Sequence, residues 1–184
     1  MVLYIDHYDS FSNTIVDYIT YLGYQVSIVK TDEQINNIEQ YSHIIIGPGP
    51  GHPDELKNIY SVIEYCQQNN LPLLGICLGH QLIAQYYGTK IIKAKQIYHG
   101  KLSEIKQIES SVLYKDHPVK FTVTRYHSLI VNDIKEPLIT LASTDNGEIM
   151  AFAHQKANIF GVQYHPEAYL TEYGLLTLKN FLAI

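Results

Sequence analysis

The chain has 184 residues, and its formal net charge is −5, from 13 Lys plus Arg against 18 Asp plus Glu. Hydrophobic residues make up 46% of the chain and charged residues 17%, a balance that builds a buried core and excludes intrinsic disorder. The acidic charge argues against a nucleic-acid partner, which needs clustered basic residues. The length favours one compact domain.

No apolar stretch approaches the ~20 residues of a membrane helix, and the N-terminus reaches Asp6 without a basic region, so it is no secretory signal. Two cysteines, Cys66 and Cys77, are too few for a disulfide scaffold. We therefore expect a cytoplasmic protein with no membrane partner, in which a free thiol stays available for chemistry.

Strands and helices alternate in the first half. Residues 2–5 predict a buried strand, and the apolar positions from Ile15 to Leu22 repeat at helical spacing until Gly23, a typical helix C-terminus. Further strands are predicted at residues 25–29, 43–46 and 72–76, and helices at residues 59–66 and 81–87. Strands that are apolar throughout indicate a parallel sheet covered on both faces.

The second half predicts short strands separated by turns, at residues 121–124, 139–142, 149–152 and 159–164. Residues 171–184 predict a closing helix. We expect an α/β three-layer sandwich with a mostly parallel central sheet, helices on both faces and a smaller antiparallel or mixed set of strands. Ligands bind such sheets at the carboxyl ends of the parallel strands, where three unusual segments fall: residues 47–53, 77–81 and 165–167.

The segment Gly75-Ile76-Cys77-Leu78-Gly79 lies at a predicted strand-to-helix junction. In the serine version of this pattern, a sharp turn presents the nucleophile above the sheet. The positive end of the following helix favours thiolate over thiol, and the N–H of Leu78 can face a developing oxyanion. A lone cysteine is more often a core residue, which is our interpretation of Cys66. The flanking glycines favour a nucleophile at Cys77.

His165-Pro166-Glu167 follows a predicted strand that Pro166 cannot continue, so the neighbouring side chains lie at the strand end. A thiol nucleophile needs a base, and the base needs a group to orient it. His165 and Glu167 supply both roles. Without a candidate nucleophile elsewhere, an unrelated surface His and Glu would be the simpler interpretation.

Residues 47–53 are rich in Gly and Pro, which predicts a stiff loop whose N–H groups at Gly49 and Gly51 can point into a pocket. An ordinary tight turn explains this segment equally well when it is taken alone. No phosphate-binding motif occurs in the chain. Cys77 and His80 form a C-x-x-H pair, but no second pair follows at zinc spacing, so we expect no metal site.

Three motifs resemble those of the class I (triad) glutamine amidotransferases: residues 47–53, 75–81 and 161–167. Three others narrow the resemblance to the small subunits of anthranilate synthase and aminodeoxychorismate (para-aminobenzoate) synthase: residues 6–11, 98–101 and 124–129. The likeness runs from the first predicted strand to the last helix. It implies a single glutamine amidotransferase type-1 domain over residues 1–184.

The resemblance implies that Cys77 attacks the side-chain amide of L-glutamine. His165 would be its base and then the acid for the leaving ammonia, oriented by Glu167. A γ-glutamyl thioester would form and be hydrolysed to glutamate. The implied oxyanion hole is the backbone N–H groups of Gly49 and Leu78, and the implied glutamine-binding residues are Gly49, Pro50, Gly51, Gln81, Ser128 and Leu129.

The resemblance also implies a partner, a large chorismate-binding synthase subunit in a heterodimer or heterotetramer. Ammonium has no lone pair to donate, so ammonia must reach that subunit by a protected path. We expect no cofactor in this chain and a Mg²⁺ requirement in the partner. The candidate partner-facing residues, which by themselves could equally be solvated loops, are Tyr8, Asp9, Ser10, Phe11, Tyr98, His99, Gly100 and Lys101.

Two alternatives stay open: a free-standing γ-glutamyl thiol hydrolase, and an inactive binding module. The 98–101 and 125–128 segments argue against the hydrolase, and the intact Cys77, His165 and Glu167 argue against the inactive module. The sequence does not choose between the anthranilate and aminodeoxychorismate pathways. The family usually has Asn, Met and Ser at three positions where this chain has His7, Tyr98 and Ala168.

Overall fold

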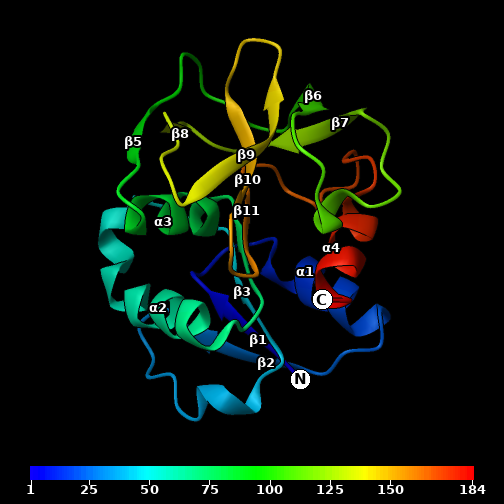
Figure 1. The fold of residues 1–184 in the computed structure, drawn as a ribbon. Coiled ribbons are helices and arrows are strands. Elements are labelled where there is room, and N and C mark those ends of the chain that lie inside the picture. Colours follow the sequence, from blue (N-terminus) through cyan, green and yellow to red (C-terminus); the bar gives the residue numbers. More distant parts are fainter.

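The computed structural model describes residues 1–184, and its centre is a nine-stranded sheet in the order β2-β1-β3-β4-β11-β10-β9-β6-β7 (Figure 1). Its strands, in chain order, are β1 (Val2–Asp6), β2 (Val26–Lys30), β3 (His43–Ile46), β4 (Leu73–Ile76), β6 (Lys101–Gln107), β7 (Lys120–Arg125), β9 (Leu138–Thr144), β10 (Ile149–His154) and β11 (Ile159–Val162). A second sheet pairs β5 (Lys90–Lys93) with β8 (Leu129–Asn132).

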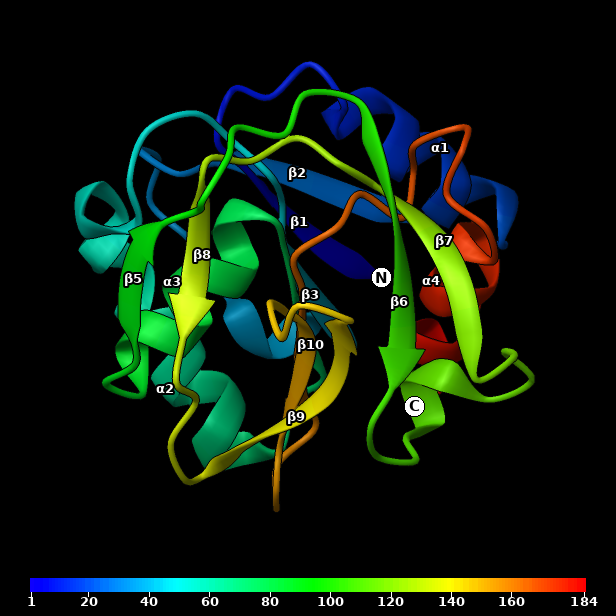
Figure 2. The ribbon, with the colours of Figure 1, turned by 90° about the horizontal axis from the view of Figure 1, so that it is seen from above.

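The large sheet changes from parallel to antiparallel pairing at β11. Strands β2, β1, β3, β4 and β11 run parallel, and β10, β9, β6 and β7 extend the same sheet in antiparallel pairing. The predicted α/β sandwich is therefore confirmed. Most of the antiparallel strands continue the main sheet instead of forming a separate set, and only β5 and β8 stand apart, against α3 (Figure 2).

Helices cover both faces of the parallel part (Figure 1). Helices α1 (Ser12–Tyr21) and α4 (Gly174–Leu182) lie on one face, and α2 (Tyr60–Asn69) and α3 (Leu78–Tyr86) lie on the other. Short 3₁₀ segments occur at Ile38–Gln40, Pro53–Ile59 and Val112–Tyr114. No helix has the length and apolar character that crossing a membrane requires.

Each face has its own apolar core. Ile15 of α1 and Phe181 of α4 belong to a cluster of 24 buried residues, whereas Ile63 of α2 and Ile83 of α3 belong to a second cluster of 19. All four side chains are fully buried, and burial of one such side chain contributes about 1.5–3 kcal/mol. The two cores fix the helices against the sheet and so fix the strand ends between them.

The sequence did not predict β5, β6 or β8. β5 places lysines at both ends and exposes Ile92, and β6 has only two apolar residues, Leu102 and Ile105. Neither therefore forms the continuous apolar run of a buried strand. Helix α3 also begins at Leu78, three residues before the predicted Gln81, because the turn at Cys77 leads directly into it. The predicted helix end at Gly23 is confirmed, with φ +91°.

Three adjacent parallel strands deliver the unusual segments to one edge. β3, β4 and β11 are neighbours in the sheet and run in the same direction. Residues 47–51 follow β3, residues 77–81 follow β4 and residues 163–167 follow β11. The carboxyl ends of the strands therefore bring together side chains that lie more than 80 positions apart in the chain.

Candidate active site

Cys77 occupies a strained turn between β4 and α3. Its φ is +52°, in the left-handed region that a residue with a Cβ adopts at a cost of about 1–3 kcal/mol. A Cβ at Gly75 would lie 2.5 Å from the carbonyl carbon of Gly79, and one at Gly79 would lie 2.2 Å from the carbonyl oxygen of Ile46. Only glycine fits at both positions. The close approach of strand and helix holds the turn, as expected for a nucleophile elbow.

Three residues after the end of β11, His165 lies against a carboxylate. Oε1 of Glu167 lies 2.6 Å from Nδ1 of His165, and both side chains are buried. The carboxylate can only accept, so Nδ1 carries the proton. Nε2 is buried and has no hydrogen-bond partner. It faces the part of the site that holds Cys77.

Burial by itself would lower the pKa of His165, but the Cys77 thiol and the Glu167 carboxylate outweigh that effect. The pKa of His165 is therefore raised well above its ordinary value. A thiol, an imidazole and a carboxylate thus lie in series, with each group in range of the next. This arrangement can deprotonate a thiol and return the proton to a leaving group.

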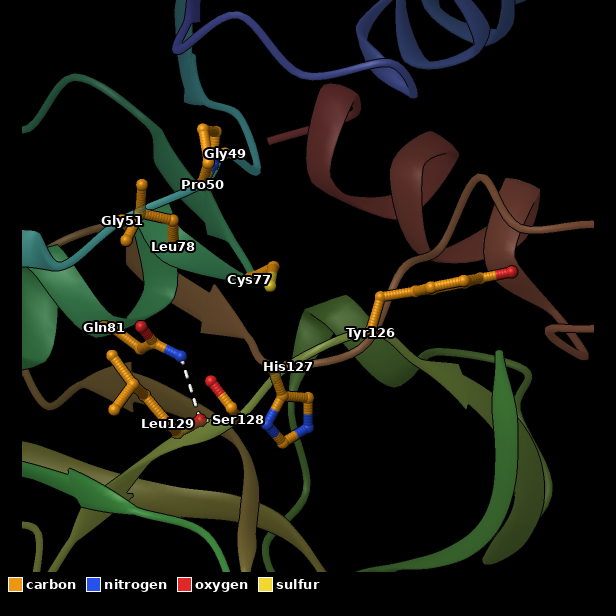
Figure 3. A pocket seen from close by; sticks show the side chains of 10 residues that line it. All are labelled: Gly49, Pro50, Gly51, Cys77, Leu78, Gln81, Tyr126, His127, Ser128 and Leu129. Atoms are coloured by element: carbon orange, nitrogen blue, oxygen red, sulfur yellow. Dashed lines mark hydrogen bonds between the residues drawn. The ribbon is translucent and has the colours of Figure 1, made fainter. Parts of the chain in front are cut away.

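A small pocket opens beside the Cys77 sulfur (Figure 3). Its volume is about 160 Å³, below the ~300–1,000 Å³ of pockets for drug-sized ligands, so it suits a small metabolite. Residues 49–51 form one wall and residues 126–129 the other. The lining residues are Gly49, Pro50, Gly51, Cys77, Leu78, Gln81, Tyr126, His127, Ser128 and Leu129.

Backbone N–H groups are available in this pocket. Those of Gly49 and Gly51 donate to no other group of the chain, whereas that of Gly47 donates to Ile5 O at 2.9 Å. Leu78 opens α3, so its N–H has no acceptor within the helix. These donors lie beside the thiol, where a developing negative charge on a substrate oxygen could accept from them.

The structure brings together every residue for which the sequence suggested glutamine contact, and adds Tyr126 and His127. The aromatic ring of Tyr126 packs against the rings of Phe11 and His165, with centroids 4.9 and 5.2 Å away. Tyr126 and His127 lie inside a motif that the resemblance had singled out, but no spacing rule gave either residue a place in the pocket.

A buried ion pair supports the wall formed by residues 126–129. Arg125 pairs with Glu148, and its Nε donates to Nε2 of His127 at 3.0 Å. Because a guanidinium N–H can only donate, Nε2 accepts and the Nδ1–H of His127 donates to Leu129 O at 2.8 Å. Burial and the Arg125 charge lower the pKa of His127 to about 3, so this imidazole stays neutral. No sequence pattern had assigned Arg125 or Glu148 to the site.

The expected partner-facing residues divide between surface and interior. Tyr98 is buried: the Arg125 guanidinium carbon lies 3.4 Å from its ring centroid, and its hydroxyl donates to Glu148 Oε2 at 3.1 Å. His99, Gly100 and Lys101 are exposed, as are Tyr8 and Ser10, while Asp9 and Phe11 are half-buried. A surface role can therefore concern the neighbours of Tyr98, but not its side chain.

The remaining thiol and the C-x-x-H histidine belong to the interior. Cys66 is fully buried in α2, and burial raises its pKa to about 12. His80 is fully buried against the ring of Phe152, at a centroid distance of 4.6 Å, and burial lowers its pKa to about 3. No group of three or more His, Cys, Asp or Glu side chains is placed to hold a metal ion.

A strained cysteine between two glycines, a His–Glu pair and a small pocket on an α/β sandwich define a class of thiol enzymes. The family model described as glutamine amidotransferase class-I matches residues 3–184, and the chain belongs to this family. The resemblance inferred from the motifs is thereby confirmed.

Within the family, the chain is similar to proteins named component 2 of anthranilate or aminodeoxychorismate/anthranilate synthase. It is 41% identical to anthranilate synthase component 2 of Saccharolobus solfataricus, over 99% of this chain and 97% of that protein. It is 38% identical to aminodeoxychorismate/anthranilate synthase component 2 of Bacillus subtilis, over 99% and 95%. A solved glutamine amidotransferase of Thermotoga maritima shares the fold, with a TM-score of 0.80 at 20% identity, over 99% of this chain and 80% of that one.

Proposed function

We propose that this chain is the glutaminase subunit of a chorismate-aminating synthase, and that it serves anthranilate synthesis, aminodeoxychorismate synthesis or both. Cys77 attacks the side-chain carbonyl carbon of L-glutamine and forms a γ-glutamyl thioester, while ammonia leaves. Water then hydrolyses the thioester to glutamate and frees the thiolate. The full-length similarity to component 2 proteins of both pathways supports this assignment.

His165 moves the protons in both steps. It accepts the thiol proton at Nε2, gives a proton to the leaving ammonia and then activates the attacking water. Glu167 keeps the imidazole oriented and stabilises its charged form through the 2.6 Å contact with Nδ1. The geometry carries this proposal: Cys77 lies in a strained turn beside the pocket, and the 2.6 Å contact with Glu167 holds His165 nearby. The raised pKa of His165 agrees with it.

The pocket gives each part of glutamine a partner of suitable chemistry. The N–H groups of Gly49 and Leu78 would hold the carbonyl oxygen as it becomes an oxyanion. Gln81, with Ser128, Leu129 and the backbone of residues 50–51, would hold the amide, amino and carboxylate groups. Gln81 is suited to this role because its Nε2 is already fixed by Leu129 O at 3.0 Å, which turns its other end to the pocket.

Ammonia released here needs a partner that uses it. We propose a large chorismate-binding subunit, docked over the exposed residues among 8–11 and 98–101, with the Mg²⁺ of the synthase reaction held by that subunit. Phe11 links this surface to the site, because its ring lies 5.2 Å from that of His165. A partner that covers Phe11 would therefore also shield the His165 side of the site from bulk water.

The test is a Cys77→Ala variant in complex with each candidate synthase. Glutamine-dependent synthesis should be abolished, while the complex still aminates chorismate with added ammonium salt at raised pH. Product analysis with the two synthases identifies the pathway. Retained glutamine use by the variant would rule out the mechanism. Full glutaminase activity of the isolated chain, with no increase when a synthase is added, would favour the free hydrolase instead.

A further inference from the structure

Gln163 is a buried polar residue that the mechanism above does not use. It follows Val162, the last residue of β11, and its side chain is fully buried. Register explains where it lies. Val162 pairs with Ile76 of β4, and Cys77 N donates to Val162 O at 2.9 Å. Gln163, which follows β11, therefore lies beside Cys77, which follows β4. Nε2 of Gln163 lies 3.7 Å from the Cys77 sulfur.

The orientation of this amide is imposed by a group that can only accept. Nε2 of Gln81 donates to Leu129 O at 3.0 Å, which fixes which end of the Gln81 amide carries the hydrogens. The same nitrogen donates to Oε1 of Gln163 at 3.1 Å. Oε1 of Gln163 therefore faces Gln81, and its N–H group is left for the sulfur.

Leu129 O is itself held by the buried wall. It also accepts from Nδ1 of His127, whose Nε2 accepts from Arg125. Each donor and acceptor along this path has one possible role, so the path from the ion pair to the thiol is directional. An apolar side chain of the same size could fill position 163 without any hydrogen-bond partner. A buried amide costs free energy unless it is hydrogen-bonded, so its presence here points to the hydrogen bonds it makes.

We infer that Gln163 is a positioning residue for the nucleophile, donating an amide N–H hydrogen bond to the Cys77 sulfur that favours the thiolate. The inference rests on the proposed function, in which Cys77 reacts as a thiolate. A hydrogen bond to an ionised acceptor is about twice as strong as one to a neutral acceptor, so this donor stabilises the thiolate more than the thiol. The bond also holds the sulfur against β11, on the side of the site that carries His165.

The other groups around the sulfur act differently. From the segment after β11 come His165, which exchanges a proton with the thiol, and Glu167 behind it. From the wall of residues 126–129 comes His127, which stays neutral. Helix α3 and the 49–51 loop contribute no charged side chain to the pocket. Gln163 is thus a neutral donor whose effect on the thiolate does not itself change with pH.

The experiment measures the rate at which iodoacetamide alkylates Cys77 in the full chain, from pH 5 to pH 10, with mass spectrometry of the peptide as the readout. We compare wild type with Gln163→Met, which keeps the size and loses the donor, and Gln163→Glu, which keeps the shape. Gln155→Met is the control, because this substitution makes the same chemical change at an exposed position. Thermal melts monitor folding of every variant.

In Gln163→Met the midpoint of the alkylation profile should move up by about one pH unit, equivalent to a roughly tenfold weaker preference for the thiolate. Gln163→Glu should move it at least as far, because a carboxylate opposes the thiolate charge. In the synthase complex, kcat for glutamine should fall about tenfold with KM changed less than twofold. Gln155→Met should match wild type in each measurement.

An alkylation profile of Gln163→Met that superimposes on that of wild type would overturn the inference. If Gln163→Met does not fold, a downward shift of the midpoint in Gln163→Glu would overturn it instead. A purely structural role would change the melting temperature without moving the midpoint. Failure of the proposed function looks different: the Cys77→Ala variant would then keep its glutaminase activity. Where Cys77 is essential and the Gln163 variants leave the midpoint unchanged, only the role of Gln163 is wrong.

Discussion

The imidazole of His165 and the carboxylate of Glu167 are joined by a 2.6 Å contact between residues two positions apart. Pro166 stands between them in the turn that follows β11, and both side chains are buried there. Cys77 and this contact with Glu167 together raise the pKa of His165 against the effect of burial. A short local motif thus becomes a base by virtue of its position at the end of β11.

Replacing this carboxylate tests its part in catalysis. Glu167→Gln keeps the shape but removes the charge, and its amide can present N–H to Nδ1, which favours the wrong imidazole tautomer. We expect kcat for glutamine to fall by about two orders of magnitude, with ammonia-dependent synthesis unchanged. Steady-state kinetics of the complex with both nitrogen sources check this. Equal loss with glutamine and with ammonium would point to a folding defect instead.

The same variant has a signature in stability against pH. A histidine whose folded pKa is raised binds its proton more tightly in the folded state. Its contribution to stability is therefore complete below its ordinary pKa of about 6.5 and is lost as the pH rises through the folded value. Urea unfolding should give wild type a larger free energy of unfolding than Glu167→Gln at pH 6, and this difference should shrink as the pH rises through the folded pKa of His165. A difference that grows with pH would contradict the raised pKa of His165.

The two thiols should react differently. A diazo-ketone analogue of glutamine should label Cys77, because the pocket admits it beside the sulfur, and leave Cys66 intact, because that thiol is fully buried with its pKa raised to about 12. Peptide mass spectrometry identifies the labelled cysteine, and excess glutamine should protect it. Labelling of Cys66 with Cys77 untouched would reverse our assignment of the two residues.

The close approach at the elbow predicts a large effect of one methyl group. Gly79→Ala would gain about 1 kcal/mol of helix propensity in α3. Its Cβ would lie 2.2 Å from Ile46 O, and such overpacking costs about 1–3 kcal/mol or more, so we expect a net loss. Gly23→Ala is the matched control, since a Cβ there meets nothing within 4 Å and only the φ of +91° opposes it. Urea unfolding should rank Gly79→Ala below the control.

Removing one member of the buried ion pair between Arg125 and Glu148 should destabilise the protein more than removing both. Glu148→Gln leaves the Arg125 guanidinium buried without its counter-charge, which costs about 3–5 kcal/mol. The double variant Arg125→Met/Glu148→Leu should recover part of this loss, because no charge is left unpaired. Chemical denaturation of the three proteins forms the comparison. Equal stability of Glu148→Gln and wild type would show that the pair is dispensable.

Much of the fold could be predicted from the sequence because the buried strands carry their own signal. Apart from Asp6 and His43 at strand ends, β1, β3 and β4 are apolar, and such runs need both faces covered whatever surrounds them. β5 and β6 could not be predicted in this way. Each has only two aliphatic residues, set among charged or polar ones, and their pairing partners decide their conformation.

The sequence by itself determined the chemistry of the site, because a cysteine between two glycines and a histidine two residues from a glutamate show their capabilities in local spacing. Only the tertiary structure decided which of the other polar residues serve that chemistry. Gln163 lies against the sulfur because pairing between β4 and β11 joins residues 86 positions apart. Tyr98 lies inside because its ring and hydroxyl contact Arg125 and Glu148. Register between distant strands depends on packing across the whole sheet, and no local spacing in the chain specifies it.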